Sequence, residues 1–253
     1  METKTASDIS YRTFGSGGPK VVLLHGGMQS SASFTRLAAA LAGTFTVYVL
    51  DRRRGGLRSE IDDLAALLDE TGAGNVFGLS SGAVVALHGA LELPRIERLA
   101  LYEPPLRYGE VDPIAWLPRY EKELAAGRPV AALITASKGT GDFRHVPRLA
   151  VSPLLRLWMR SDPAVRDLVP TMRGDAAVVE QASGPLSRYA AVTAETLLLG
   201  GERSPAYLNG VLTGLEPVLP RVRRVTLDGV GHVAADNSGK PERVAAELRK
   251  FFR

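Results

Sequence analysis

The serine with the most suggestive surroundings in this sequence is Ser80, at the centre of the pentapeptide GLSSG, residues 78–82. The pentapeptide follows the apolar run Asn75–Ser80 and opens the helical pattern Ser81–Leu93. A serine at such a strand–turn–helix junction projects its hydroxyl above the sheet, and glycines flank it because neighbouring elements approach closely. The G-x-S-x-G string alone also fits an ordinary Gly/Ser turn, so the junction is what indicates a nucleophile.

A base for this serine is sought among four histidines. His232 lies in the glycine-rich segment GVGHVAADN, just after the last apolar run, whereas His25 lies in an early HGG loop. His88 falls inside a helical pattern, and His145 falls in a segment without strands, where a lone histidine is usually a surface residue. Because imidazole titrates near neutral pH, His232 can take a proton from Ser80 and later return it to a leaving group.

The HGG loop, residues 25–27, indicates where backbone donors for an oxyanion lie. Glycine lets the chain turn so that an N–H faces the pocket, which favours Gly27 as a donor over Met28. The second expected donor is the N–H of Ser81, at the start of the predicted helix. His25 itself is interpreted as a structural brace of this loop.

Six apolar runs alternate with helical patterns along the chain, which predicts an α/β fold with a mostly parallel central sheet and helices on both faces. The predicted strands are residues 20–27, 44–51, 75–80, 98–103, 196–201 and 221–228. The predicted helices between and after them are residues 31–43, 59–72, 81–93, 205–219 and 241–252.

The alternation stops between about residues 104 and 190, where proline-punctuated helical pieces occur without a strand. This stretch is too long for a connecting loop in a compact domain. We therefore expect a core formed by residues 1–104 and 191–253, and a helical cap formed by residues 105–190.

Composition excludes several classes of protein. The 253 residues contain no cysteine, which rules out disulfides, thiolate metal sites and a cysteine nucleophile. Neither a secretory signal nor a membrane span is evident, so we expect a cytoplasmic protein with a small-molecule substrate and no membrane partner. The net charge of +4 is spread along the chain, with Arg52–Arg54 as its only tight run, so we expect no nucleic-acid partner. The sequence leaves open whether the protein forms a homodimer.

The ordered motifs HGG, GLSSG and GVGH on alternating strands and helices resemble the α/β-hydrolase family over nearly the whole chain. Within the family, the sequence resembles the branch of small esterases, cofactor-free haloperoxidase-like enzymes and carbon–carbon bond hydrolases. It implies an eight-stranded type of core, a helical cap after the sixth strand, a Ser–His–acid triad, and neither a metal nor an organic cofactor. Dehalogenases and epoxide hydrolases of this fold use a carboxylate where Ser80 stands, so those reactions are disfavoured.

The acid of the triad departs from the usual family pattern. Most members carry an aspartate after the penultimate strand, but here that loop reads GERSP, residues 201–205, with Ser204 at the expected position. Glu103, at the end of a predicted strand, is our candidate, because certain haloalkane dehalogenases place their acid there. Glu202 and Asp228 are the alternatives.

These features predict a serine hydrolase that cleaves an ester-like bond, such as a carboxylic ester, thioester or lactone, through an acyl-enzyme on Ser80. The cap is expected to shape a pocket for a small hydrophobic substrate. The expected pocket residues are Met28, Trp116, Trp158 and Met159.

Two other functions fit the same motifs. Carbon–carbon bond cleavage or another non-hydrolytic step of small-molecule metabolism uses the same serine and histidine, and the fold does not distinguish these reactions. A ligand-binding or receptor protein with weak catalysis is the second alternative, and the missing aspartate at Ser204 is its best support.

Overall fold

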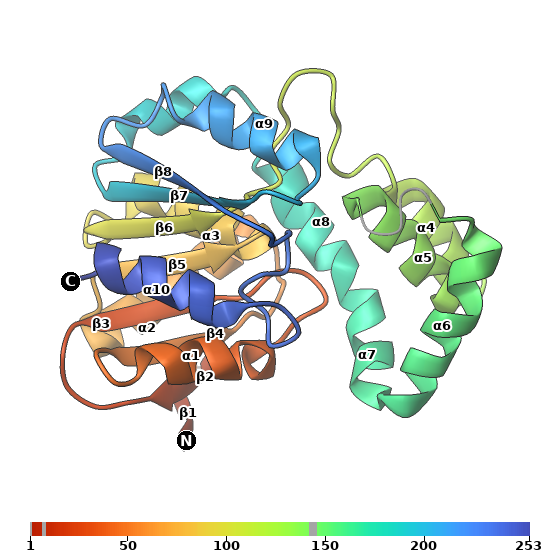
Figure 1. Cartoon of the computed structure of the whole chain (residues 1–253), viewed down its shortest axis with the longest axis horizontal. Coiled ribbons are helices and arrows are strands. Elements are labelled where there is room, and N and C mark those ends of the chain that lie inside the picture. The colour runs from red at the N-terminus through yellow and green to blue at the C-terminus, as the bar shows by residue number, and fades with distance from the viewer. Residues whose placement is uncertain (1, 7–8, 142–145) are drawn as a thin grey trace.

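The computed structural model describes residues 2–6, 9–141 and 146–253, so His145 lies outside the described residues. Its centre is an eight-stranded sheet (Figure 1). In the order of their positions across the sheet, the strands are β1 (Glu2–Ala6), β2 (Ile9–Phe14), β4 (Thr46–Asp51), β3 (Lys20–Leu24), β5 (Asn75–Leu79), β6 (Arg98–Tyr102), β7 (Glu195–Gly201) and β8 (Val222–Leu227). β1 pairs with β2, and β2 with β4, in antiparallel orientation. The other neighbouring strands are parallel.

The predicted α/β architecture is confirmed, and each of the six predicted strands is present. The two N-terminal strands were not predicted individually. The alternation in β2 is short, with Ile9 and Tyr11 buried and the residues between them partly exposed. This hairpin extends one edge of the sheet, away from the later motifs.

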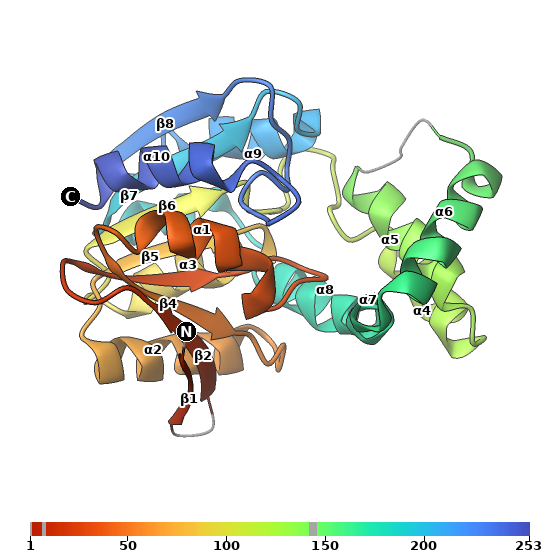
Figure 2. The ribbon, with the colours of Figure 1, turned by 60° about the horizontal axis from the view of Figure 1, so that its bottom comes forward.

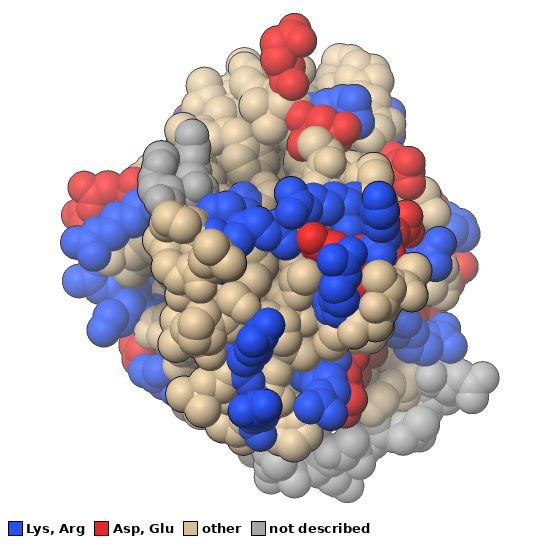
Figure 3. Space-filling view, turned by 90° about the vertical axis from the view of Figure 1, so that its right-hand side faces the viewer, with Lys and Arg blue, Asp and Glu red and all other residues tan. Residues whose placement is uncertain are grey.

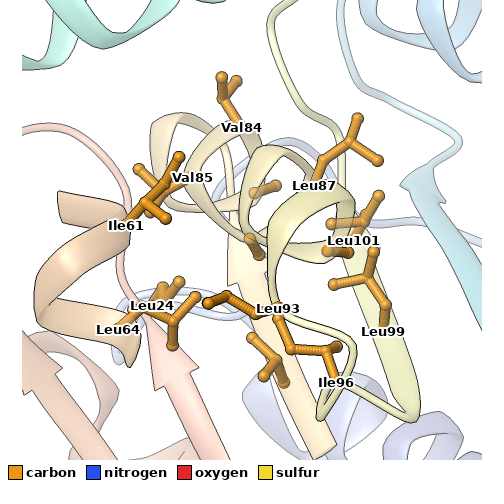
Figure 4. Packing of buried hydrophobic residues seen from close by; sticks show 14 of the residues in the cluster. Leu24, Ile61, Leu64, Val84, Val85, Leu87, Leu93, Ile96, Leu99 and Leu101 are labelled. Atoms are coloured by element: carbon orange, nitrogen blue, oxygen red, sulfur yellow. The ribbon is translucent and has the colours of Figure 1, made fainter. Parts of the chain in front are cut away.

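Helices cover both faces of the sheet (Figures 1 and 2). On one face lie η1 (Ser31–Phe34), α1 (Thr35–Leu41) and α10 (Pro241–Phe251), and on the other lie α2 (Leu57–Thr71), α3 (Ser81–Glu92) and α9 (Ala206–Leu215). Successive strand residues point to opposite faces of the sheet. Leu23 therefore packs in the apolar core under α1 and α10, and Leu24 packs in the core under α2, α3 and α9. Figure 4 shows Leu24 among side chains of α2 and α3, which fixes α3 firmly on the sheet.

A separate helical lobe stands beside the sheet (Figure 2). It consists of α4 (Leu117–Ala125), α5 (Pro129–Thr140), α6 (Arg148–Ser161) and α7 (Pro163–Leu168). Its apolar core includes Tyr120, Leu133 and Leu155, and it also takes in Met172 and Ala176, which lie beyond the lobe in the chain. On the outer end of the lobe, Lys and Arg side chains are interspersed with uncharged ones (Figure 3).

The last part of the insertion is built differently from this lobe. After η2 (Val169–Thr171), helix α8 (Met172–Gln181) contacts α2 and α3, and Val178 and Val179 belong to the core on that face of the sheet. The chain then returns to the sheet through η3 (Leu186–Ala191). The segment predicted as one cap, residues 105–190, is thus a lobe of α4–α7 followed by a helix that packs on the core.

Across the residues that the structure describes, every helix is too short or too polar to cross a lipid bilayer.

Candidate active site

Ser80 occupies a sharp turn between β5 and α3. Its backbone angles, φ 55° and ψ −124°, lie in a region that L-residues seldom adopt, at a cost of about 1–3 kcal/mol. A Cβ on Gly78 would lie 2.5 Å from Ala83 Cα, and one on Gly82 would lie 2.4 Å from the carbonyl oxygen of His25. Both glycines are therefore required by close backbone contact, as the GLSSG motif predicts.

The sheet register brings the motifs to one edge. Gly78 of β5 pairs with Leu24 of β3 on one side and Leu101 of β6 on the other. The HGG loop, Ser80 and Glu103 consequently follow three adjacent parallel strands at their carboxyl ends, where ligands bind in open α/β sheets. The Ser80 N–H donates to the carbonyl of Tyr102 at 2.9 Å, which continues the hydrogen-bond ladder of the sheet as far as Ser80.

His232 and Glu103 form the second part of the site. His232 Nδ1 lies 2.7 Å from Glu103 Oε2, and the Gly201 N–H donates to Glu103 Oε1 at 2.6 Å. The Glu103 side chain is fully buried, whereas 17% of the His232 side chain is exposed. With both carboxylate oxygens engaged, Glu103 holds the imidazole with Nδ1 protonated, leaving Nε2 free to accept a proton.

The other candidate acids lie elsewhere. Glu202 Oε2 accepts a hydrogen bond from the Gly229 N–H at 2.7 Å and faces solvent. Asp228 is exposed, and its backbone carbonyl accepts a hydrogen bond from the Arg243 guanidinium. Ser204 Oγ, at the usual family position for the acid, is buried without a hydrogen-bond partner in the described structure. Among these candidates the structure brings only Glu103 to His232.

The two predicted oxyanion donors are brought to the same cavity. Gly27 and Ser81 both line the cavity that contains Ser80 and His232. The neighbouring Gly26 N–H is already used, since it donates to Gln29 Oε1 at 2.8 Å. Met28 has a left-handed φ of 57° and packs against the lobe of α4–α7.

The cavity above Ser80 lies between the sheet edge and the insertion, with about 410 Å³ of empty space, part of it open to solvent. Its described walls are largely apolar, and they carry only two ionisable side chains of Asp, Glu, His, Lys or Arg type, His232 and Asp175. The lining residues are Gly27, Ser80, Ser81, Pro105, Pro113, Ile114, Trp116, Thr140, Met172, Asp175, Ala176, Val179, Tyr207 and His232.

Of the four pocket residues predicted from the sequence, Trp116 lines this cavity. Met159 is buried in the core of the lobe, and Trp158 is 45% exposed on the outer side of α6. The reason is helical geometry, because Val151, Leu155 and Met159 recur every four residues and face inward, which turns Trp158 outward. The walls instead come from Met172, Asp175 and Val179 of α8, which the sequence did not single out as a group.

A buried charge cluster adjoins the cavity and was also not predicted. The Arg52 guanidinium, 1% exposed, lies 2.5 Å from Glu60 and 3.0 Å from Asp175, and Arg54 lies 3.0 Å from the other Asp175 oxygen. Burial alone would raise the pKa of Asp175, but the two guanidinium groups outweigh it and lower that pKa. Two of the three arginines in the run Arg52–Arg54 thus belong to the interior, not to a solvated loop.

His25 has the bracing role that the sequence indicates. Its Nδ1 lies 3.0 Å from the Gly26 carbonyl, and its Nε2 accepts the Arg52 N–H at 3.3 Å. Burial, followed by the charges of Arg52 and Arg54, lowers the pKa of His25 from 6.5 to about 3. The ring is therefore neutral at physiological pH.

The neutral His25 makes stability depend on pH. Below pH 6.5 the unfolded chain takes up a proton that the folded chain refuses, so the stabilisation present above pH 6.5 is lost as the pH falls toward 3. Between pH 7 and pH 5 this loss is about 2 kcal/mol. We expect the free energy of unfolding of His25→Asn, measured with urea, to decrease correspondingly less between pH 7 and pH 5 than that of the wild-type protein. An identical decrease in both proteins would contradict the assignment.

Among the described residues, no three His, Asp or Glu side chains gather in a way that could hold a metal ion.

Comparison with known proteins agrees with this geometry. The model of the "Alpha/beta hydrolase family" matches residues 21–247. An alpha/beta hydrolase from Sphaerobacter thermophilus DSM 20745 is 32% identical, with each chain covered fully and a TM-score of 0.80. A hydrolase from Pseudomonas aeruginosa PA01 is 22% identical, with 99% of this chain and 97% of that chain covered and a TM-score of 0.73.

The enol-lactonase from Burkholderia xenovorans LB400 shares the fold at 20% identity, with 99% of each chain covered and a TM-score of 0.70. A comparison with curated proteins finds no match. The family model spans most of the sequence and contains Ser80, Glu103 and His232 within its limits. This chain belongs to the alpha/beta hydrolase family.

Proposed function

We propose that this protein is a serine hydrolase that cleaves an ester-like bond of a small, uncharged, apolar substrate through an acyl-enzyme on Ser80. The observation that carries the proposal is the 2.7 Å contact between His232 Nδ1 and the buried Glu103, on a histidine that shares one cavity with Ser80. A histidine oriented in this way is what activates a serine hydroxyl for attack on a carbonyl.

In the first half of the reaction, Ser80 Oγ attacks the carbonyl carbon while His232 Nε2 accepts its proton. The oxygen of the carbonyl becomes negative and receives hydrogen bonds from the N–H groups of Gly27 and Ser81. The tetrahedral intermediate then collapses. His232 donates its proton to the departing alcohol, thiol or ring oxygen, and the acyl group remains on Ser80.

In the second half, water takes the place of the departed group. His232 accepts a proton from that water as it attacks the acyl carbon, and the same two N–H groups stabilise the second tetrahedral intermediate. Collapse returns the proton to Ser80 Oγ and releases a carboxylic acid. The Glu103 carboxylate stabilises the imidazolium that forms in each half.

The cavity favours a neutral substrate. Ile114, Trp116 and Met172 contribute apolar walls, and none of the described lining residues is a lysine or an arginine. Arg52 and Arg54 are near but are occupied by carboxylates. An anionic group on the substrate would be desolvated here without a partner, which costs several kcal/mol for an unpaired charge.

The proposal predicts hydrolysis of uncharged aryl esters. We expect p-nitrophenyl acetate and butyrate to give a burst or steady release of nitrophenol, and a fluorophosphonate to label one serine, identified as Ser80 by peptide mass spectrometry. An aryl ester with a terminal carboxylate on its acyl chain is the matched control and should react at least 10-fold more slowly, because its charge is desolvated. A folded protein that neither turns over these esters nor is labelled would contradict the proposal.

A further inference from the structure

Arg52 contacts both backbone segments that carry the proposed oxyanion donors. Its Nη1 donates to the carbonyl of His25 at 2.8 Å and to the hydroxyl of Ser81 at 2.8 Å. His25 begins the loop that leads to Gly27, and Ser81 is itself the second donor. One nitrogen of a fully buried side chain therefore ties together the ends of β3 and β5 at the point where the oxyanion would be bound.

The remaining donors of Arg52 keep that nitrogen in place. Nε and Nη2 form a forked pair with the two oxygens of Glu60, at 2.5 and 3.1 Å. Glu60 lies on α2, which packs on the core. A guanidinium held by a two-point contact has little freedom to rotate, so the position of Nη1 is determined by the scaffold and not by the ligand.

Ser81 is held from two directions. Its hydroxyl accepts from Arg52 Nη1 and donates to Asp175 Oδ1 at 2.7 Å. Because Ser81 is the first residue of α3, fixing its side chain also limits how its backbone N–H can tilt. Oxyanion donors are effective only when they are already aimed at the developing charge.

Charge balance gives the cluster a second effect. Asp175 lines the cavity, and a Cβ on Gly27 would lie 3.4 Å from the Asp175 carboxylate. An uncompensated carboxylate at this place would oppose the negative oxygen that forms during acyl transfer. Arg52 and Arg54 pair with its two oxygens, so the cluster of Arg52, Arg54, Glu60 and Asp175 has two positive and two negative charges.

We propose that Arg52 is a positioning residue of the oxyanion hole, acting through the His25 carbonyl and the Ser81 hydroxyl, and that it neutralises Asp175 beside the reacting oxygen. The proposal rests on the proposed function, because it assumes that an oxyanion forms at Ser80. It also explains why Asp175 is brought from the insertion: this residue joins the wall of the cavity to the catalytic turn.

The test compares three variants in the wild-type background, with p-nitrophenyl acetate as substrate and an aryl trifluoromethyl ketone as a reversible oxyanion-forming inhibitor. Ser81→Ala removes the hydroxyl and keeps the backbone N–H. Arg52→Lys keeps a charge but loses the fork to Glu60. Arg53→Lys is the matched control, because Arg53 pairs with Asp63 on the same helix α2 yet does not line the cavity.

For Ser81→Ala we expect kcat to fall about 10- to 100-fold and KM to change by less than twofold. This decrease in kcat is smaller than the one that follows removal of a whole oxyanion donor. Ketone binding should weaken by a similar factor, since it too places a negative oxygen in the hole. Arg52→Lys should show the same pattern to a larger degree, and Arg53→Lys should show neither change. Fluorophosphonate titration corrects each rate for the fraction of folded sites.

Unchanged kcat and unchanged ketone binding in Ser81→Ala would overturn the proposal, even if Arg52→Lys fails to fold. A loss of melting temperature in Arg52→Lys with normal kcat per titrated site would likewise show a purely structural role. An inactive wild-type protein would instead overturn the proposed function, so the two failures are distinguishable.

Discussion

Replacement of Ser80 by alanine is expected to lower kcat for aryl esters by about 10⁴- to 10⁶-fold and to abolish fluorophosphonate labelling. The reason is that, among the described residues that line the cavity with His232, Ser80 is the one that stands on the strained turn between β5 and α3. Rates measured by nitrophenol release, with mass spectrometry of the intact protein for labelling, provide the check.

Ser204→Ala is the matched control for this prediction. Ser204 is a second serine near the site, at the usual family position for the acid, but its hydroxyl makes no hydrogen bond in the described structure. We expect it to leave kcat within about twofold, because the substitution removes a buried hydroxyl that has no hydrogen-bond partner to lose. Persistent turnover in Ser80→Ala, at more than about a tenth of the wild-type rate, would remove Ser80 from the mechanism.

Glu103→Gln is expected to lower kcat by about 10³- to 10⁴-fold while the protein stays folded. The amide can present its NH₂ group to His232 Nδ1, which places the proton on Nε2 and leaves no free nitrogen to accept the Ser80 proton. The substitution also removes the charge that stabilises the imidazolium. Steady-state kinetics across pH 5–9 measure both effects, because a shifted acidic limb, which reports protonation of the general base, distinguishes them from simple unfolding.

Glu202→Gln serves as the comparison for the acid. Glu202 lies in the loop that carries the acid in most family members, yet its carboxylate accepts from the Gly229 N–H at the surface. Near-normal kcat is expected there. If Glu202→Gln were inactive and Glu103→Gln active, the acid would have been assigned to the wrong strand end.

Much of the fold could be predicted because the strands of a buried parallel sheet read as continuous apolar runs. β5 and β7 were placed to within one residue. The N-terminal hairpin was missed, because its first strand, ETKTA, is polar and only its pairing with β2 defines it. The packing of α8 on both the lobe and the core was not predicted, since the periodicity of a helix does not show what it packs against.

The candidate site likewise contains some residues that the sequence predicts and others that it does not. Ser80 and His232 stand in local patterns that predict a nucleophile and a base without a structure. Glu103 was inferred from a departure, namely a serine where the family usually has an aspartate. The partnership of Arg52 with Asp175 joins residues 123 positions apart in the sequence, so no local pattern could reveal it. The run Arg52–Arg54 predicted no buried pairing, since the sequence shows it only as the one tight run of positive charge.

The way the insertion is attached has a consequence for how its sequence can change. Met172 and Ala176 of α8 belong to the apolar core of the α4–α7 lobe, whereas Val178 and Val179 of the same helix pack on the sheet side. Asp175, which pairs with Arg52 and Arg54, lies between Met172 and Val178 on this helix. A substitution in the lobe that shifts the start of α8 would therefore also displace the cavity wall, so the lobe cannot change independently of the cavity.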